Sequence, residues 1–208
     1  TSGSVAGADF TVSGFTISSA SRTSDSIVTI VFTESGTADT DATPLSSVSG
    51  SLSDGVGNTT TSGSTTPIDA ASAVFLSATT ADNDTDGQID RILATFSEDI
   101  SSGTVAGADF TATGYTVSSA SRTADSVITI VLTESGSGDT DAVPSTSVVG
   151  SISDLVSSVT TSGTKTPTDA ASPVLLSQNY KDTNTNGTID RFDLTFSENI
   201  AYDECETG

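Results

Sequence analysis

One stretch of the chain carries acidic side chains at the spacing of a metal-binding loop. Residues 82–90 read Asp-Asn-Asp-Thr-Asp-Gly-Gln-Ile-Asp, so Asp82, Asp84 and Asp86 take the first, third and fifth positions of an EF-hand-type loop. Short carboxylates at alternate positions bring their oxygen atoms onto one hard cation, and Gly87 permits the sharp turn after them. This pattern predicts a calcium site with the affinity of extracellular modules, roughly 0.1–1 mM.

The rest of the loop matches the calcium pattern only in part. The Gln88 carbonyl is expected to face the ion, Ile89 to anchor the loop in the core, and Asp90 to stand where ligation often runs through water. The twelfth position, usually a bidentate Glu, is Leu93, so the missing ligand must come from the turn at 98–99 or from another loop acid. A solvated Asp/Gly turn is the alternative interpretation. The flanks are expected to be strands, so no EF-hand fold is implied.

A second copy of this loop follows one hundred residues later, with two carboxylates replaced by amides. It keeps the ligand oxygens but carries less charge, so weaker calcium binding is expected. The predicted ligands of this copy are Asp182, Asn184, Asn186, Thr188 and Asp190.

Other charged groups are less specific. The loop after the most apolar strand of each copy is either a further cation site or a charged surface loop; its acids are Glu34, Asp39 and Asp41, and then Glu134, Asp139 and Asp141. Asp69 and Asp169 lie at the joints between copies, where a linker calcium and a turn-forming Asp both fit. Four arginines are expected to pair with neighbouring carboxylates, namely Arg22, Arg91, Arg122 and Arg191.

The composition argues against several function classes. Its 27 acidic and 6 basic residues give a net charge of −21, which repels nucleic acid and anionic lipid, so neither nucleic acid nor membrane insertion is expected. No stretch is long and apolar enough for a transmembrane helix. The chain has no His and one Cys, Cys205, so pairs of nucleophile and base are scarce and no enzymatic activity is expected.

The elements that position these residues are set by an internal repeat. Shifting the sequence by one hundred residues aligns it on itself without a gap, with roughly 60 identical pairs in that period. Thr, Ser and Val dominate over helix formers, which favours strands. Apolar alternation predicts seven strands per period: 73–78, 89–97, 110–113, 115–119, 126–133, 147–153 and 156–162. This predicts an all-β fold of tandem Ig-like β-sandwich repeats, with 126–133 the most buried strand.

The run from Asp69 through the acidic loop to Ile100 carries a resemblance. It resembles bacterial Ig-like domains of the surface-layer (SbsA-like) type, which open with a Pro-Val strand and carry a Thr-Phe-Ser-Glu motif on the second strand, here at 95–98 and 195–198. The first copy has Ala73 where the second has Pro173. The resemblance implies an extracellular spacer or assembly module without catalytic residues.

The repeat frame predicts a complete domain at 70–169 between two partial ones. Residues 1–69 lack the first two strands, and 170–200 supply only those two, so each part leaves strand edges unpaired. Three interpretations stay open: a window cut from a longer array, closure within one chain, and donation of the C-terminal strands to the next copy in an open polymer. The sequence has no initiator Met or signal peptide, which suggests a mature or excised piece.

Together these features predict a secreted or cell-surface structural protein. We expect a calcium-stabilised fibre, stalk or surface layer whose main partner is another copy of the chain. The alternative is an adhesin segment that binds a glycan or a cell-surface receptor, although no aromatic cluster for sugar stacking is visible in the sequence. Residues 201–208 leave the repeat, and Cys205 within them is either a free thiol or a cross-link between chains.

Overall fold

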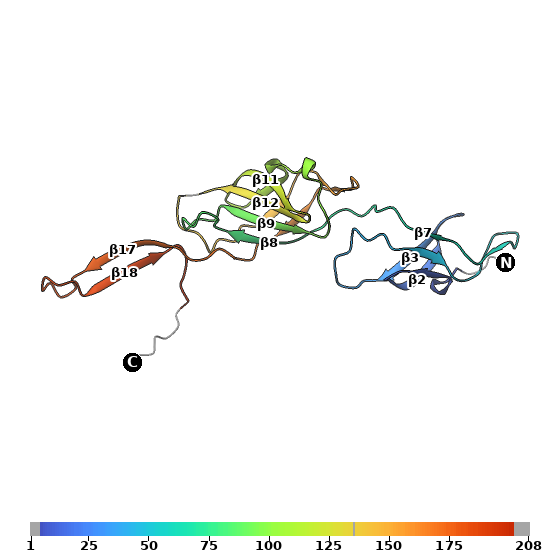
Figure 1. The fold of residues 1–208 in the computed structure, drawn as a ribbon, viewed down its shortest axis with the longest axis horizontal. Helices are drawn as coiled ribbons and strands as arrows, with labels where there is room; N and C mark the ends of the chain where they lie inside the picture. Colours follow the sequence, from blue (N-terminus) through green and yellow to red (C-terminus); the bar gives the residue numbers. More distant parts are fainter. Residues whose placement is uncertain (1–4, 135, 202–208) are drawn as a thin grey trace, which may run out of the picture. The chain divides into compact units, whose positions relative to one another are not determined.

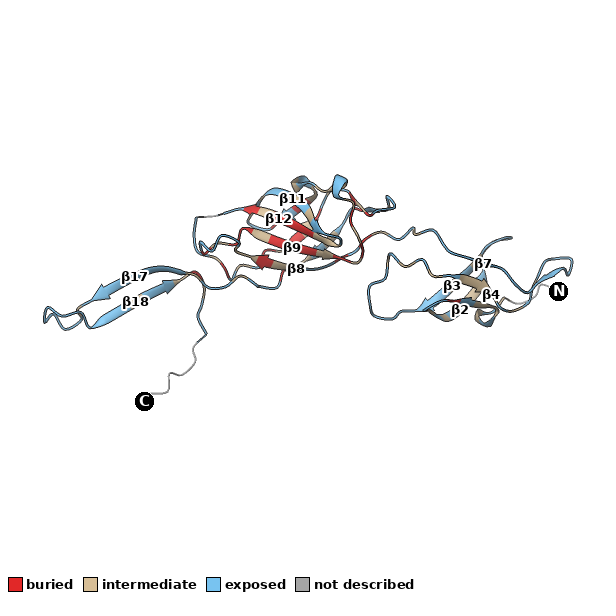
Figure 2. Cartoon of the chain, in the orientation of Figure 1, coloured by how far each residue is buried: buried red, intermediate tan, exposed pale blue. Residues whose placement is uncertain are grey.

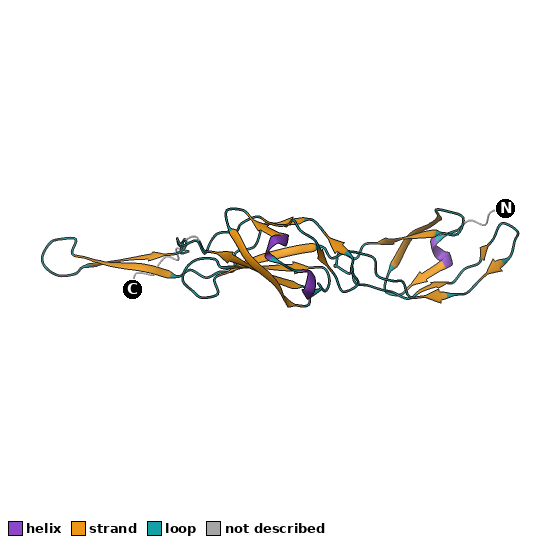
Figure 3. Cartoon of the chain, turned by 90° about the horizontal axis from the view of Figure 1, so that it is seen from above, coloured by secondary structure: helices purple, strands orange, loops and turns teal. Residues whose placement is uncertain are grey.

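The computed structural model describes residues 5–134 and 136–201, which divide into two compact units, Thr1–Ala71 and Ser72–Gly208 (Figure 1). The prediction of an all-β chain is confirmed. The helical segments of the described residues are three single 3-10 turns, η1 (Gly7–Asp9), η2 (Ser102–Thr104) and η3 (Gly107–Asp109) (Figure 3). The predicted non-repeat tail, with Cys205, lies almost entirely outside the described residues.

The first unit contains small antiparallel sheets. Its strands are β1 (Phe10–Val12), β2 (Thr16–Arg22), β3 (Val28–Thr33), β4 (Ser46–Val48), β5 (Leu52–Ser53), β6 (Thr59–Thr60) and β7 (Ser64–Thr65). They pair as β1-β4-β7, β2-β3 and β5-β6.

The second unit repeats this set and adds two hairpins. Its strands are β8 (Phe75–Ala81), β9 (Arg91–Phe96), β10 (Phe110–Ala112), β11 (Thr116–Ala124), β12 (Val127–Thr133), β13 (Thr146–Val148), β14 (Ile152–Ser153), β15 (Val159–Thr160), β16 (Gly163–Lys165), β17 (Leu175–Lys181) and β18 (Arg191–Phe196). They pair as β11-β12-β9-β8, β10-β13-β16, β14-β15 and β17-β18. Corresponding pairs lie in the same register, since Phe10 faces Val48 as Phe110 faces Val148.

The core lies between the sheets of the second unit, an arrangement consistent with a β-sandwich (Figure 2). On β9, Ile92, Ala94 and Phe96 are buried while the alternate residues are half exposed, as the apolar alternation predicts. β12 lies inside the sheet between β11 and β9 and has buried residues on both faces, as expected of the segment predicted to be the most buried. The ring of Phe96 stacks on Phe75 with centroids 5.3 Å apart.

The first unit has far less of a core. Val12 is its one fully buried hydrophobic residue among those described. Phe32 is 37% exposed, whereas Leu132 at the corresponding position of the second unit is 4% exposed. The difference arises because β12 has β9 beside it, while β3 pairs only with β2 in the described part of the chain.

Two predicted strands differ from those observed. The segment 147–153 forms two short strands, because Val149 and Gly150 turn to donate their N–H groups to the Asp109 carbonyl. A Cβ at Gly150 would lie 2.0 Å from Asp109 Oδ1, so no other residue fits this crossing. The segment 156–162 begins in a turn around Asp154 and forms a strand only at β15.

Candidate metal centre

The first acidic loop connects β8 to β9 and gathers its predicted ligands. Oxygen atoms of Asp82, Asp84 and Asp86 all lie within 4.8 Å of one another. Two oxygens that share one calcium ion are at most about 5 Å apart, since each calcium–oxygen distance is about 2.3–2.6 Å. This spacing is therefore compatible with one shared cation.

Backbone N–H groups hold the loop in this shape. Asp82 accepts from Thr85 at 2.7 Å and from Gly87 at 2.9 Å, and Asp90 accepts from the Asn83 N–H at 3.0 Å. Gly87 has a φ of +95° and Thr85 a φ of +60°, a region that costs free energy for a β-branched residue. Ile89 follows and is fully buried, which confirms its predicted role as the anchor.

An acid from outside the loop reaches it from the end of β12. Oxygen atoms of Asp84, Asp90 and Glu134 lie within 4.8 Å of one another, so Glu134 can share a cation with two acids of the loop. The negative charge of Asp86, followed by burial and then the other loop acids, raises the pKa of Glu134. A carboxylate in such a field is the kind of group that a divalent cation neutralises. The requirement for a loop acid was readable from the sequence, but its identity was not.

Asp139, from the same loop as Glu134, braces the site. Its carboxylate accepts from the Ile89 N–H at 2.9 Å and from the Tyr115 hydroxyl at 2.6 Å, and its own N–H donates to the Gly87 carbonyl at 3.0 Å. Burial, followed by the bond to this carboxylate, raises the pKa of Tyr115. Gln88 adds a contact, since its amide donates to Asp86 at 2.9 Å and accepts from the Gly136 N–H. Glu134 and Asp139, two of the acids that follow the most apolar strand, thus contact the loop at 82–90.

The second loop, between β17 and β18, has the same turn but fewer charges. Asp182 accepts from the Gly187 N–H at 2.7 Å, and Asn186 accepts from the Thr188 N–H at 2.8 Å. The hydroxyl and N–H of Thr183 lower the pKa of Asp190. Around this loop the described residues contain no group of three acids within ligand distance. The predicted site at 182–190 therefore stays a prediction, and its weaker rank is consistent with this geometry.

The first loop also touches the base of the following hairpin. A Cβ on Gly87 would lie 2.6 Å from Leu176 Cδ2 and 3.2 Å from Ser197 Cβ, so the two segments approach each other closely at this glycine. The Ser197 hydroxyl, in turn, lies 2.6 Å from the buried Thr140 hydroxyl. The loop thus packs at the point where β17 and β18 leave the sandwich.

The remaining charged groups occupy turns and ion pairs. Asp69 and Asp169 accept the N–H two residues ahead, at 3.0 and 3.1 Å, as turn-forming Asp residues do, and the linker calcium stays a prediction. No three acids gather around 34–41 among the described residues. The predicted arginine pairs are confirmed, and their acids are Asp25 for Arg22, Asp90 for Arg91, Asp125 for Arg122 and Asp193 for Arg191.

Part of the chain is similar to an outer cell wall protein of Brevibacillus brevis. The two are 40% identical over 81 residues, which is 39% of this chain and 8% of that protein. No protein-family model matches the chain, and no solved structure gives a significant match. Within the described residues, no helix is both long enough and apolar enough to span a membrane.

Proposed function

We propose that the chain is a cell-surface structural protein in which the C-terminal hairpin of one copy completes the open sheet of the next, with calcium stiffening the assembly. The similarity to an outer cell wall protein supports the surface location and a structural rather than enzymatic role. The β-sandwich arrangement of the second unit is in keeping with an Ig-like repeat. Separate observations support the two parts of the proposal, which are hairpin donation between copies and calcium binding.

An apolar cavity in the first unit, called the slot from here on, carries the proposal. In the second unit Phe75 packs against Gly163, where a Cβ would lie 3.0 Å from the Phe75 Cβ, and this ring is 2% exposed. The first unit has a cavity of about 280 Å³ at the corresponding place, lined among others by Phe10, Ile30, Val48 and Gly63. An apolar cavity open to water favours an apolar occupant.

The hairpin β17-β18 has the side chains for this slot. Leu175 corresponds to Phe75 and Phe192 to Ile92, and they are 47% and 48% exposed, although Ile92 is fully buried. β12 pairs with β9 so that Ile130 faces Ile92. If the donated hairpin keeps this register, Phe192 of a second copy lies opposite Ile30 on the free edge of β3. Main-chain hydrogen bonds and burial of apolar side chains then stabilise the contact together.

The test is the concentration dependence of assembly in the 208-residue chain. We expect sedimentation to give polymers that shorten on dilution and on addition of a peptide spanning residues 170–200, which occupies the open sheet. A monomer that persists at all concentrations would overturn donation between copies and would favour closure within the chain.

Calcium is proposed at 82–90 with Glu134, and more weakly at 182–190. Isothermal titration calorimetry should show the stronger site disappearing in Asp84→Asn. The matched gain-of-charge variant Asn184→Asp should tighten the second site, because its loop then regains a carboxylate at the third position. No heat with calcium, together with a melting temperature insensitive to EDTA, would refute this part.

Binding of a glycan or receptor is the second candidate. The observation that favours it is the Tyr180 and Phe192 pair, which is 60% and 48% exposed and meets edge to face at 4.5 Å. Exposed aromatic rings suit sugar stacking. Saturable binding on a glycan array, lost in Tyr180→Ala, would favour this function, whereas no saturable ligand favours the structural one.

A further inference from the structure

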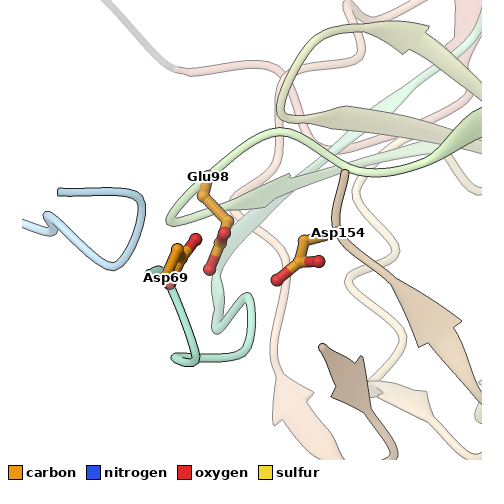
Figure 4. A group of neighbouring side chains, drawn as sticks. All are labelled: Asp69, Glu98 and Asp154. Carbon is orange, nitrogen blue, oxygen red and sulfur yellow. The ribbon is translucent and has the colours of Figure 1, made fainter. Parts of the chain in front are cut away.

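Two buried carboxylates meet in the second unit, outside the loop at 82–90. Glu98 follows β9 and is 5% exposed, and Asp154 follows β14 and is 2% exposed. Their oxygen atoms lie within 4.8 Å of one another. Figure 4 draws both side chains as sticks and also labels Asp69, which belongs to the first unit.

The backbone fixes these two residues beside each other. Ile100 and Asp154 form an antiparallel bridge, and the Ser101 N–H donates to the Ser153 carbonyl at 2.8 Å. The Thr104 hydroxyl accepts from the Ser153 N–H at 3.0 Å. These bonds hold the backbones that carry the two carboxylates side by side.

One oxygen of Asp154 has no partner in the described residues. Its Oδ1 accepts N–H groups from Val156 at 2.9 Å and Ser158 at 2.8 Å, while its buried Oδ2 accepts no hydrogen bond. A buried carboxylate oxygen without a partner is costly, and a second carboxylate beside it adds repulsion. Oδ2 of Asp154 therefore needs either a proton or a cation beside it.

The first unit contains the same turn with this oxygen satisfied. Asp54 accepts from the N–H groups of Val56 and Asn58 at 2.9 and 2.8 Å, as Asp154 does, but its Oδ2 also accepts from the Asn58 side-chain amide at 2.8 Å. Residue 158 is Ser, so the second unit lacks that donor. The substitution leaves Oδ2 of Asp154 available where a buried Glu lies next to it.

Arg122, which contacts the same segment, is engaged elsewhere. It donates to the Ile100 carbonyl at 3.1 Å and lies 3.6 Å from Asp125. These contacts are with a backbone carbonyl and a largely exposed acid. Oδ2 of Asp154 therefore remains available to another group.

We propose that Glu98 and Asp154 hold one calcium ion. The ion binds between Glu98 and Oδ2 of Asp154, because their spacing fits two oxygens on one calcium and carboxylates are the ligands that it prefers. It locks the start of the 98–104 segment to the turn after β14. This site is independent of the loop at 82–90 and shares none of its ligands.

Counting bound calcium in variants of the 208-residue chain tests this site. We expect equilibrium dialysis to show one calcium fewer in Ser158→Asn, because the new amide occupies Oδ2 as Asn58 does in the first unit. The reciprocal variant Asn58→Ser is the matched control and should gain none, since Asp54 is exposed and has no buried partner acid. In EDTA, Ser158→Asn should melt at or above the wild-type temperature, because its buried oxygen is satisfied.

Two further variants make the result decisive. Glu98→Gln should also bind one calcium ion fewer than the wild type. If Ser158→Asn melts at a lower temperature in EDTA, the calcium count of Glu98→Gln is the deciding measurement. An unchanged calcium count in Glu98→Gln would overturn the site and point to a shared proton. Asp84→Asn removes calcium from the loop alone, so failure of the loop site is distinguishable from failure of this one.

Discussion

The proposed assembly leads to a quantitative prediction about Phe192. This side chain is 48% exposed on the hairpin, and its counterpart Ile92 is fully buried in the sandwich. Taking about 200 Å² for a Phe side chain, docking removes ~100 Å² from water. At ~25 cal/mol per Å² this amounts to about 2.5 kcal/mol. Phe192→Ala should therefore weaken the contact between copies by roughly 60-fold, since 1.4 kcal/mol is a factor of ten.

Sedimentation across a dilution series measures this change as a rise in the concentration at which polymers form. Thr195→Ala is the matched control, because it lies on the same strand and its counterpart Thr95 is only half buried. It should leave the midpoint nearly unchanged. Equal effects of the two variants, or no effect of Phe192→Ala, would refute the assigned register and the hairpin as the occupant of the slot.

Three other predictions concern the units themselves. Phe75→Ala should destabilise the second unit by about 3–5 kcal/mol in chemical denaturation, and Phe32→Ala the first by much less, since only Phe75 is buried. Glu134→Gln should weaken the first calcium site in calorimetry while leaving the apo melting temperature unchanged or raised, because it relieves repulsion. The Asn58 side chain lowers the pKa of Asp54, so this carboxylate adds stability above its unfolded pKa that is lost as pH falls through its folded pKa. Asn58→Ser should raise that pKa in an NMR titration and move acid unfolding of the first unit to higher pH.

Local patterns predicted the fold class well, and the geometry of the first loop is compatible with the calcium site that they predict. Alternation along β9 predicted its buried face, and the apolar run of β12 predicted its high burial. Both signals depend on side-chain periodicity, which is a property of a few adjacent residues. The short strands around β14 and β15 were misjudged, because the turn at Asp154 and the crossing at Gly150 depend on distant partners.

The same reasoning explains which site residues escaped prediction. Glu134 lies beside Asp90 because β12 pairs with β9, an arrangement between segments some forty residues apart. Glu98 and Asp154 meet through the bridge at Ile100. No spacing rule within a loop reports such pairs. A usable signal was present only for Glu134, since the loop at 82–90 lacked an acidic ligand.

The position of the first loop would couple the proposed calcium ion to the proposed assembly. Gly87 packs against Leu176, and the Ser197 hydroxyl bonds to that of Thr140, so the loop and the base of the hairpin share one surface. Calcium at ten times its dissociation constant stabilises the bound state by about 1.4 kcal/mol. This is small against the core of the second unit but comparable with the docking energy of one hairpin side chain. A shift in calcium near its dissociation constant should therefore change how firmly the hairpin is held while leaving the sandwich folded, which places control of the proposed polymer at the joint rather than in the core.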